Sequence, residues 1–208
     1  MNNFSNILAS GLSVLGLESA RSAIPKMLEY LVLLDKWNKT FNLTAIREPE
    51  KMLTHHLLDS LAVVPYIPGK TIIDIGSGAG LPGIPIALSR PECKVTLLDS
   101  NQKKVTFLRQ ACIQLSLGNV TVSGDRAESW CPEVKYEVAI SRAFSDLTTF
   151  VRVAAHLCQP GGVMLAMKGT YPSEELEQLP STVTLEEVIP LIVPELGAER
   201  HLVVMRVK

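Results

Sequence analysis

The sequence has 208 residues, of which 47% are hydrophobic and 20% are charged, and its net charge is −1. This composition is typical of a folded globular protein, and no apolar run approaches the roughly 20 residues that a membrane-spanning helix needs. Residues 171–196 contain six Glu and no Lys or Arg, so the remainder of the chain carries +5, which permits binding of a polyanion on one face.

The first segment, "MNNFSNILASGLS", lacks the basic start and the cleavage site of an export signal. We therefore expect an ordinary helix there and a cytoplasmic protein with no membrane partner. The cysteines are widely spaced and form no C-x-x-C pair, so we expect reduced, partly buried thiols and no metal site. They are Cys93, Cys112, Cys131 and Cys158.

The first seventy residues have the pattern of helices. The segment "IPKMLEYLVLLDKWNK" places apolar residues on one face at three- and four-residue spacing. Residues 51–64 repeat the pattern, and Pro65 ends it. We predict a helical cap over residues 1–68 and a second domain over residues 69–208. The rings of Trp37 and Phe41 could stack on a base, but the place of Trp37 in the apolar stripe favours core packing.

From Thr71 onward, strands and helices alternate, which predicts a parallel sheet with helices on both faces. The last two strands follow each other with no helix between them, so they must pair as a hairpin, and the final strand is antiparallel. We therefore predict an α/β fold with a mostly parallel seven-stranded sheet. The predicted strands are 71–75, 94–98, 119–123, 137–141, 162–167, 182–189 and 201–207. The predicted helices between them include 102–117, 146–158 and 173–179.

A glycine-rich turn, within "TIIDIGSGAGLPGIP", follows the first strand. Read from Gly78 it matches the G-x-G-x-x-G pattern of a dinucleotide site, and read from Asp74 it gives D-x-G-x-G-x-G. Reading from Gly78 leaves Gly76 as an unexplained insertion between the strand and the motif. Reading from Asp74 accounts for Gly76, Gly78 and Gly80 together. Pro82 and Pro85 lack the amide protons that a pyrophosphate would need. The turn therefore favours a cofactor that is not held by phosphates.

S-adenosylmethionine is such a cofactor, and acids at three successive strand ends suit its polar groups. Asp74 is placed for its amine and Asp99 for its ribose hydroxyls. After the third strand, either the side chain of Asp125 or the backbone of Ala127 and Glu128 could meet the adenine edge. Any one of these acids could instead cap a helix, and for Asp125 both interpretations stay open.

Several motifs together resemble one family. They are "KWNKTFNLTAIREP", "HHLLDSL", "IDIGSGAGLPGIPIA", "LLDS", "FLRQ", "SRAF", "MKG" and "ERHLVV", which span nearly the whole chain. The glycine turn alone resembles the class I methyltransferases. The combination is similar to the bacterial small-subunit ribosomal RNA guanine-N7 methyltransferases (methyltransferase G, also called glucose-inhibited division protein B).

The resemblance implies methyl transfer from S-adenosylmethionine to N7 of a guanine near the decoding centre of 16S rRNA. Guanine N7 carries a lone pair and no proton, so we expect positioning by Arg142 and Lys168 rather than a general base. One departure is His55, where we expect a basic residue before the family's histidine, His56. The resemblance places the cofactor contacts on Gly76, Leu81, Ala127, Glu128 and Arg142.

The ends of the strands also predict an edge that faces RNA, because ligands bind outside the carboxyl ends of parallel strands. Basic residues follow the third, fourth and fifth strands, and an antiparallel last strand returns its own start to the same edge. Lys51 in the cap is equally well explained as a solvated surface residue. The expected RNA-facing residues are Arg126, Arg142, Lys168, Arg200 and His201, with Arg47, Lys51, His55 and His56 from the cap.

Three other functions compete with this one. A small-molecule or other RNA methyltransferase would share the cofactor half, a nicotinamide oxidoreductase would need the Gly78 register, and an RNA-binding module would not require the glycine turn. Cys131 lies before the fourth strand, so we expect it to be structural rather than a nucleophile. The expected partner is 16S rRNA or the small ribosomal subunit, and we expect a monomer.

Overall fold

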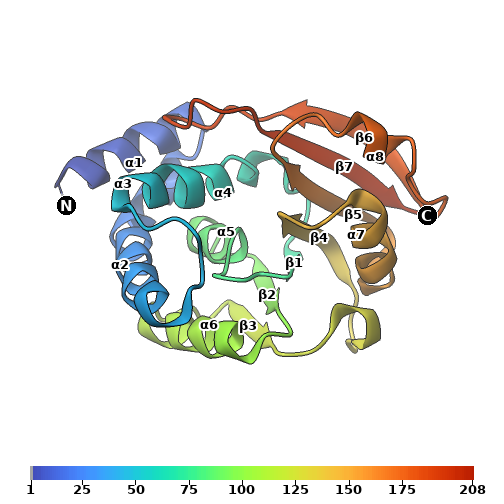
Figure 1. Ribbon diagram of the computed structural model, residues 1–208, viewed down its shortest axis with the longest axis horizontal. Helices are drawn as coiled ribbons and strands as arrows, with labels where there is room; N and C mark the ends of the chain where they lie inside the picture. The colour runs from blue at the N-terminus through green and yellow to red at the C-terminus, as the bar shows by residue number, and fades with distance from the viewer. Residues whose placement is uncertain (1) are drawn as a thin grey trace.

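The apolar runs form a seven-stranded sheet in the computed structural model, which describes residues 2–208 (Figure 1). The strand order is β3-β2-β1-β4-β5-β7-β6, and all the neighbouring pairs are parallel except the two that involve β7. The predicted α/β fold with an antiparallel last strand is therefore confirmed. The strands are β1 (Thr71–Ile75), β2 (Lys94–Leu98), β3 (Val120–Ser123), β4 (Tyr136–Arg142), β5 (Cys158–Lys168), β6 (Val183–Pro190) and β7 (His201–Val207).

Helices cover both faces of the sheet. Four lie in the predicted cap: α1 (Asn2–Val14), α2 (Ile24–Phe41), α3 (Pro49–Met52) and α4 (Asp59–Leu61). Four more follow the first strand: α5 (Gly83–Ser89), α6 (Gln102–Gln114), α7 (Leu147–Ala154) and α8 (Ser173–Leu176). Short 3₁₀ segments lie at Glu18–Ala23, Val64–Tyr66, Ala127–Ser129 and Ala155–Leu157.

The core consists of two layers, one on each face of the sheet. Alternate residues of a strand point to opposite faces, so Ile72 of β1 lies in one layer and Ile73 in the other. The cap, α5 and α6 pack on the first face, and α7 and α8 pack on the second (Figure 1). Buried cap residues such as Leu57 and Leu61 belong to the same cluster as Ile84 of α5. The cap therefore extends one core layer, and the boundary at residue 68 stays a prediction.

Several element bounds differ from the sequence expectation, and the helices expected over 146–158 and 173–179 end early, at Ala154 and Leu176. The helix expected over residues 51–64 contains a π-helical segment, Leu53–Leu58, between α3 and α4. α6 ends three residues early, because Ser116 adopts a left-handed φ of 52°. β5 was expected to begin at residue 162, but it begins at Cys158 and includes the Pro-Gly-Gly sequence before that residue. Gly161, with a φ of 74°, lies where the register with β4 shifts, so the strand begins at Cys158 and bulges before it pairs fully.

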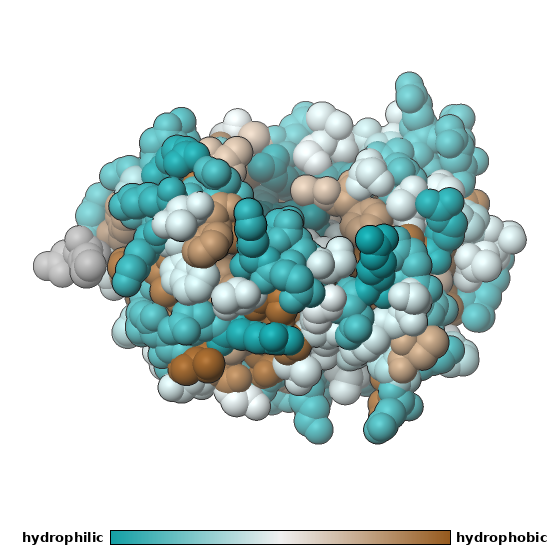
Figure 2. Space-filling view, turned by 60° about the horizontal axis from the view of Figure 1, so that its bottom comes forward, coloured by the Kyte–Doolittle hydropathy of each residue, from teal (hydrophilic) through white to brown (hydrophobic). Residues whose placement is uncertain are grey.

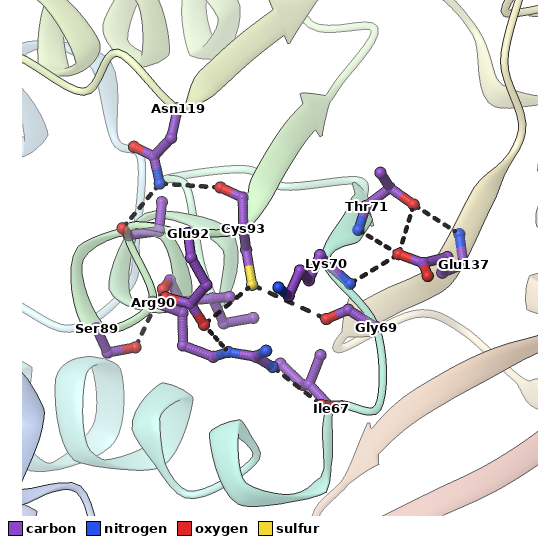
Figure 3. Close-up of polar contacts among 12 residues, drawn as sticks. Ile67, Gly69, Lys70, Thr71, Ser89, Arg90, Glu92, Cys93, Asn119 and Glu137 are labelled. Atoms are coloured by element: carbon purple, nitrogen blue, oxygen red, sulfur yellow. Dashed lines mark hydrogen bonds and ion pairs between the residues drawn. The ribbon is translucent and has the colours of Figure 1, made fainter.

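The amino-terminal edge of the sheet is closed by side-chain hydrogen bonds (Figure 3). Glu137 Oε2 accepts hydrogen bonds from the backbone N–H groups of Lys70 and Thr71, at 2.7 and 2.8 Å. Asn119 donates to the carbonyl oxygens of Ala87 and Cys93, at 3.0 and 3.1 Å. These contacts fix where β1 and β2 begin, and so they also fix the position of the opposite edge, where both strands end.

Hydrophilic side chains cover most of the face shown in Figure 2, with apolar residues scattered among them. None of the helices within residues 2–208 is long and apolar enough to cross a bilayer. Trp37 is half-buried and its ring packs edge-on against Phe107, with 5.7 Å between ring centroids. This contact confirms the expected core role of Trp37. The thiol of Cys131, which we expected to be structural, is exposed because its segment precedes β4 as an irregular loop.

Candidate active site

The glycine turn after β1 has an open part and a packed part. Gly76 and Gly78 adopt left-handed φ values of 69° and 59°, and a Cβ atom added to either would lie no closer than 3.8 Å to a neighbouring atom. Gly83 is different, since a Cβ there would lie 2.2 Å from Leu97 Cδ2. The first two glycines therefore form a bare backbone surface that a ligand can approach, whereas Gly83 lets α5 pack on β2.

Asp74 lies in β1 directly beneath this turn and is fully buried. Its Oδ2 accepts a hydrogen bond from Gly83 N at 2.9 Å, so the carboxylate holds the start of α5. Its Oδ1 has no hydrogen-bond partner among the described residues, which leaves a buried acceptor available. Burial raises the pKa of Asp74 to about 7, although the hydrogen bond from Gly83 N and, less strongly, the charge of Arg142 oppose that shift.

Asp99 follows β2 and lies on the other side of the turn. Its Oδ2 accepts from Gly78 N at 2.9 Å, and its Oδ1 accepts from Asn101 N at the same distance. Lys104 Nζ, from the first turn of α6, lies 3.7 Å from Asp99 Oδ2. Sequence reasoning found Asp99 but missed Lys104. Lys104 lies in the first turn of the helix that follows Asp99, and a side chain in that turn can reach back to the acid. Its position in the sequence could therefore have identified it.

The residues expected near an adenine lie in the segment after β3. Asp125 is exposed and accepts a hydrogen bond from the hydroxyl of Ser123. Ala127 and Glu128 follow in the single 3₁₀ turn, with Ala127 half-buried and Glu128 exposed. Leu81 is placed differently, because its side chain is buried and its N–H donates to Ser77 O at 3.0 Å within the glycine turn.

A second polar group lies where the cap meets the ends of β4 and β5. Arg142 Nη1 donates to His55 O at 2.9 Å and to Asp59 Oδ2 at 3.2 Å. Asp59 Oδ1 accepts from Arg200 Nε at 2.7 Å. Asp59 is 2% exposed and was missed by sequence reasoning. The signal for it was an acid within the apolar run "HHLLDSL", since a buried carboxylate requires a cationic partner.

Lys168, at the end of β5, is paired within the protein. Its Nζ lies 3.0 and 2.7 Å from the two carboxylate oxygens of Glu175 in α8. Glu175 Oε2 also accepts from Leu147 N at 2.7 Å, at the start of α7. Glu175 is a further residue that the sequence did not identify, because nothing in its acidic surroundings marks it as a partner of Lys168.

The two histidines of the cap have different surroundings. His56 is 4% exposed, its Nε2 lies 2.9 Å from Thr44 Oγ1, and its pKa falls to about 4, mainly through burial and secondly through Arg142. His56 thus supports the preceding loop through Thr44, and its expected role toward RNA stays a prediction. His55 is half-buried, and its Nδ1 lies 2.8 Å from Thr54 Oγ1.

A cavity of about 340 Å³ gathers several of the predicted residues between the cap and the carboxyl edge of the sheet. Arg47 and Arg126 are exposed elsewhere, and Arg47 donates to Asn42 Oδ1 at 2.8 Å. Lys51 pairs with Glu48 on the surface, and His201 Nδ1 lies 3.3 Å from Gly169 O, outside the cavity lining. The polar residues that line the cavity are His55, His56, Asp59, Arg142, Lys168 and Arg200.

Comparison with known proteins identifies the family. The model of the family described as rRNA small subunit methyltransferase G matches residues 23–203. The chain belongs to this family. It is 52% identical over 206 residues to "Ribosomal RNA small subunit methyltransferase G" of Nitrosospira multiformis, covering 96% of this chain and 95% of that protein. It is also 52% identical over 201 residues to the protein of the same name from Laribacter hongkongensis, covering 97% of each.

Solved structures support the fold. A SAM-dependent methyltransferase from Aquifex aeolicus superposes with a TM-score of 0.57 at 18% identity, covering 77% of this chain and 94% of that one. TrmN from Thermus thermophilus gives a TM-score of 0.54 at 19% identity, covering 75% of this chain and 53% of that one. This member of the methyltransferase G family therefore has the class I methyltransferase fold with an N-terminal helical cap.

Proposed function

We propose that the protein transfers a methyl group from S-adenosylmethionine to N7 of a guanine in 16S rRNA near the decoding centre. One observation carries the proposal. The bare turn at Gly76 and Gly78 and the cavity lined by Arg142, Lys168 and Arg200 lie at the same edge of the sheet, so cofactor and polyanion sites adjoin. Membership of the rRNA methyltransferase family supports the class of substrate.

The residues at the turn fit S-adenosylmethionine, which supplies an activated methyl group on its sulfonium. Open space above Gly76 and Gly78 leaves room for a ligand against the backbone, and the unpaired Oδ1 of Asp74 offers an acceptor for a donor group. Asp99, whose Oδ2 accepts from Gly78 N, would also accept from the ribose hydroxyls. We assign the adenine edge to the segment that contains Asp125, Ala127 and Glu128, with the choice between side chain and backbone open.

The reaction requires alignment of the reacting groups rather than removal of a proton. Because guanine N7 has a lone pair and no proton, the protein has to hold the base in line with the methyl group and to exclude water. Arg142 and Lys168 suit this positioning role, because Asp59 and Glu175 hold their side chains in place. The positive charge of the sulfonium would move to the guanine with the methyl group, and Asp59 and Glu175 offset the charges of Arg142 and Lys168 at the site.

A methyl-transfer assay tests the proposal. The protein is incubated with S-adenosylmethionine carrying a labelled methyl group and with small ribosomal subunits or 16S rRNA that lack the modification. We expect labelled 7-methylguanosine in a digest of the 16S rRNA and none in a large-subunit rRNA control. Cofactor binding by calorimetry without transfer to either substrate would overturn the proposed function.

Since the proposed substrate is the ribosome, we expect the protein to act in the cytoplasm, as a monomer.

A further inference from the structure

Asp59 is a buried carboxylate shared by two arginines from distant parts of the chain. Its Oδ2 accepts from Arg142 Nη1 at 3.2 Å, and its Oδ1 accepts from Arg200 Nε at 2.7 Å. The side chain of Asp59 is only 3% exposed, so water has little access to replace either contact. One carboxylate therefore fixes two guanidinium groups, one at the end of β4 and one just before β7, at the same cavity.

Each guanidinium has five N–H groups, and the protein uses only some of them. Arg142 uses Nη1, and its Nε and Nη2 have no hydrogen-bond partner within residues 2–208. Arg200 uses Nε toward Asp59 and Nη1 toward Glu199 O, while its Nη2 has no partner in that part of the chain. The arginine side chains are 20% and 23% exposed. Asp59 neutralises one of the two charges, so the three side chains together keep a net charge of +1 and several available donors.

This combination suits a phosphodiester better than a base. Fixed planar donors match the oxygens of a phosphate, which also neutralises the remaining charge. A phosphate held there would fix the backbone that carries the target guanine, which is how Arg142 would help to position the base. Resting on the proposed function, we infer that this cavity binds one backbone phosphate of the substrate RNA between Arg142 and Arg200, and that Asp59 is the positioning residue for both.

Replacement of Asp59 distinguishes a positioning role from a simple effect of its charge, because the two roles predict opposite changes in RNA binding. If Asp59 only lowered the local positive charge, Asp59→Asn would strengthen binding of a polyanion. If Asp59 holds both arginines, the amide introduced by Asp59→Asn can accept from only one of them, because its nitrogen is a donor, and binding of RNA weakens. We therefore expect Asp59→Asn to raise KM for small subunits several-fold.

The experiment measures methyl transfer to small ribosomal subunits at several salt concentrations. The variants are Arg200→Ala, Arg200→Lys and Asp59→Asn, with Arg152→Ala as the matched control. Arg152 is exposed on α7 and lines a different cavity with Lys135 and Lys208, so its loss changes net charge equally. For Arg200→Ala we expect kcat/KM to fall about tenfold at low salt. The slope of log kcat/KM against log salt should become shallower by about one.

Cofactor affinity and the comparison with the control variant distinguish the phosphate site from the alternatives. Affinity for S-adenosylmethionine should stay within about twofold in Arg200→Ala, and Arg200→Lys should recover the salt slope but not the full KM, because lysine lacks the planar donors. A slope for Arg200→Ala equal to that of Arg152→Ala overturns the phosphate site, and stronger RNA binding by Asp59→Asn, with an unchanged melting temperature, overturns its positioning role. Wild-type protein that methylates no rRNA contradicts the proposed function instead.

Discussion

At the scale of single residues, the glycines of the turn serve two purposes, because Gly76 and Gly78 leave the backbone open whereas Gly83 lets α5 pack on β2. The sequence located the turn and the acids around it, because strand ends and glycines leave clear local patterns. It could not show that Asp74 faces inward to Gly83 N, since that depends on how closely α5 packs. It also missed Asp59, whose partner Arg200 is 141 residues away.

Gly83→Ala tests the packed part of the turn. The added methyl group would lie 2.2 Å from Leu97 Cδ2, and we expect the free energy of unfolding to fall by about 1–3 kcal/mol. The measurement is urea denaturation followed by circular dichroism. Gly169→Ala is the control, because nothing lies within 4 Å of a Cβ there, and equal losses in the two variants would contradict the packing account.

Asp74 should give the folded state a measurable pH dependence. Burial raises its pKa from 3.8 to about 7, so its favourable contribution is complete below about pH 4 and is lost as the pH rises to about 7. Asp74→Asn has no titratable group at this position, so the variant does not lose this contribution as the pH rises. We expect the stability of the variant relative to wild type to rise by about 3 kcal/mol between pH 4 and pH 7, as measured by urea denaturation across that range.

His56 contributes with the opposite sign, which is why the variant comparison is needed. Its pKa is lowered to about 4, so its contribution is present above pH 6.5 and is lost as the pH falls through 4. The two slopes partly cancel in the wild-type protein. A difference between Asp74→Asn and wild type that stays constant over this range would show that folding does not raise the pKa of Asp74.

At the scale of elements, strands were predicted more accurately than helix ends. The bounds of β1, β2 and β7 match the sequence expectation, because each is a short apolar run with clear flanks. The π-helical segment Leu53–Leu58 was not predictable, since a single wider turn inside a helix leaves the apolar pattern of the flanking turns in place. That segment carries both cap histidines and leads directly into Asp59, so the unforeseen local geometry lies at the candidate site.

Asn101 is expected to stabilise α6 and, through it, the cofactor end of the sheet. Its Oδ1 caps the helix by accepting from the N–H groups of Lys103 and Lys104, at 3.0 and 3.4 Å. Asn101→Ala should cost about 1 kcal/mol of stability. It should also weaken binding of S-adenosylmethionine, because Lys104 then lies less firmly beside Asp99. Thermal unfolding and calorimetry measure the two effects, and Lys103→Ala, which keeps the cap, should show neither.

At the scale of the whole molecule, the sequence predicted a cap and a sheet but not which face the cap covers. That choice depends on contacts between segments far apart in the chain, such as those of α4 with α5. The shared core layer has a consequence for unfolding, because neither part can expose its apolar surface while the other stays folded.

Cap and sheet should therefore unfold together. The chain has two tryptophans, Trp37 in α2 and Trp130 just before β4. In Trp37→Phe the fluorescence reports on the sheet side, and in Trp130→Phe it reports on the cap. We expect each variant to give a fluorescence midpoint in urea that coincides with its own circular dichroism midpoint. A cap that melts at clearly lower urea than the sheet would contradict the shared core.

The reversed direction of β7 also sets an order of events during synthesis. The glycine turn and its acids are complete once β2 and α6 have been made, so cofactor-binding residues exist early. Arg200 precedes the last strand, and it reaches Asp59 only when β7 has paired with β5. A growing chain can therefore complete the proposed phosphate site of Arg142, Asp59 and Arg200 only after its last strand has been made.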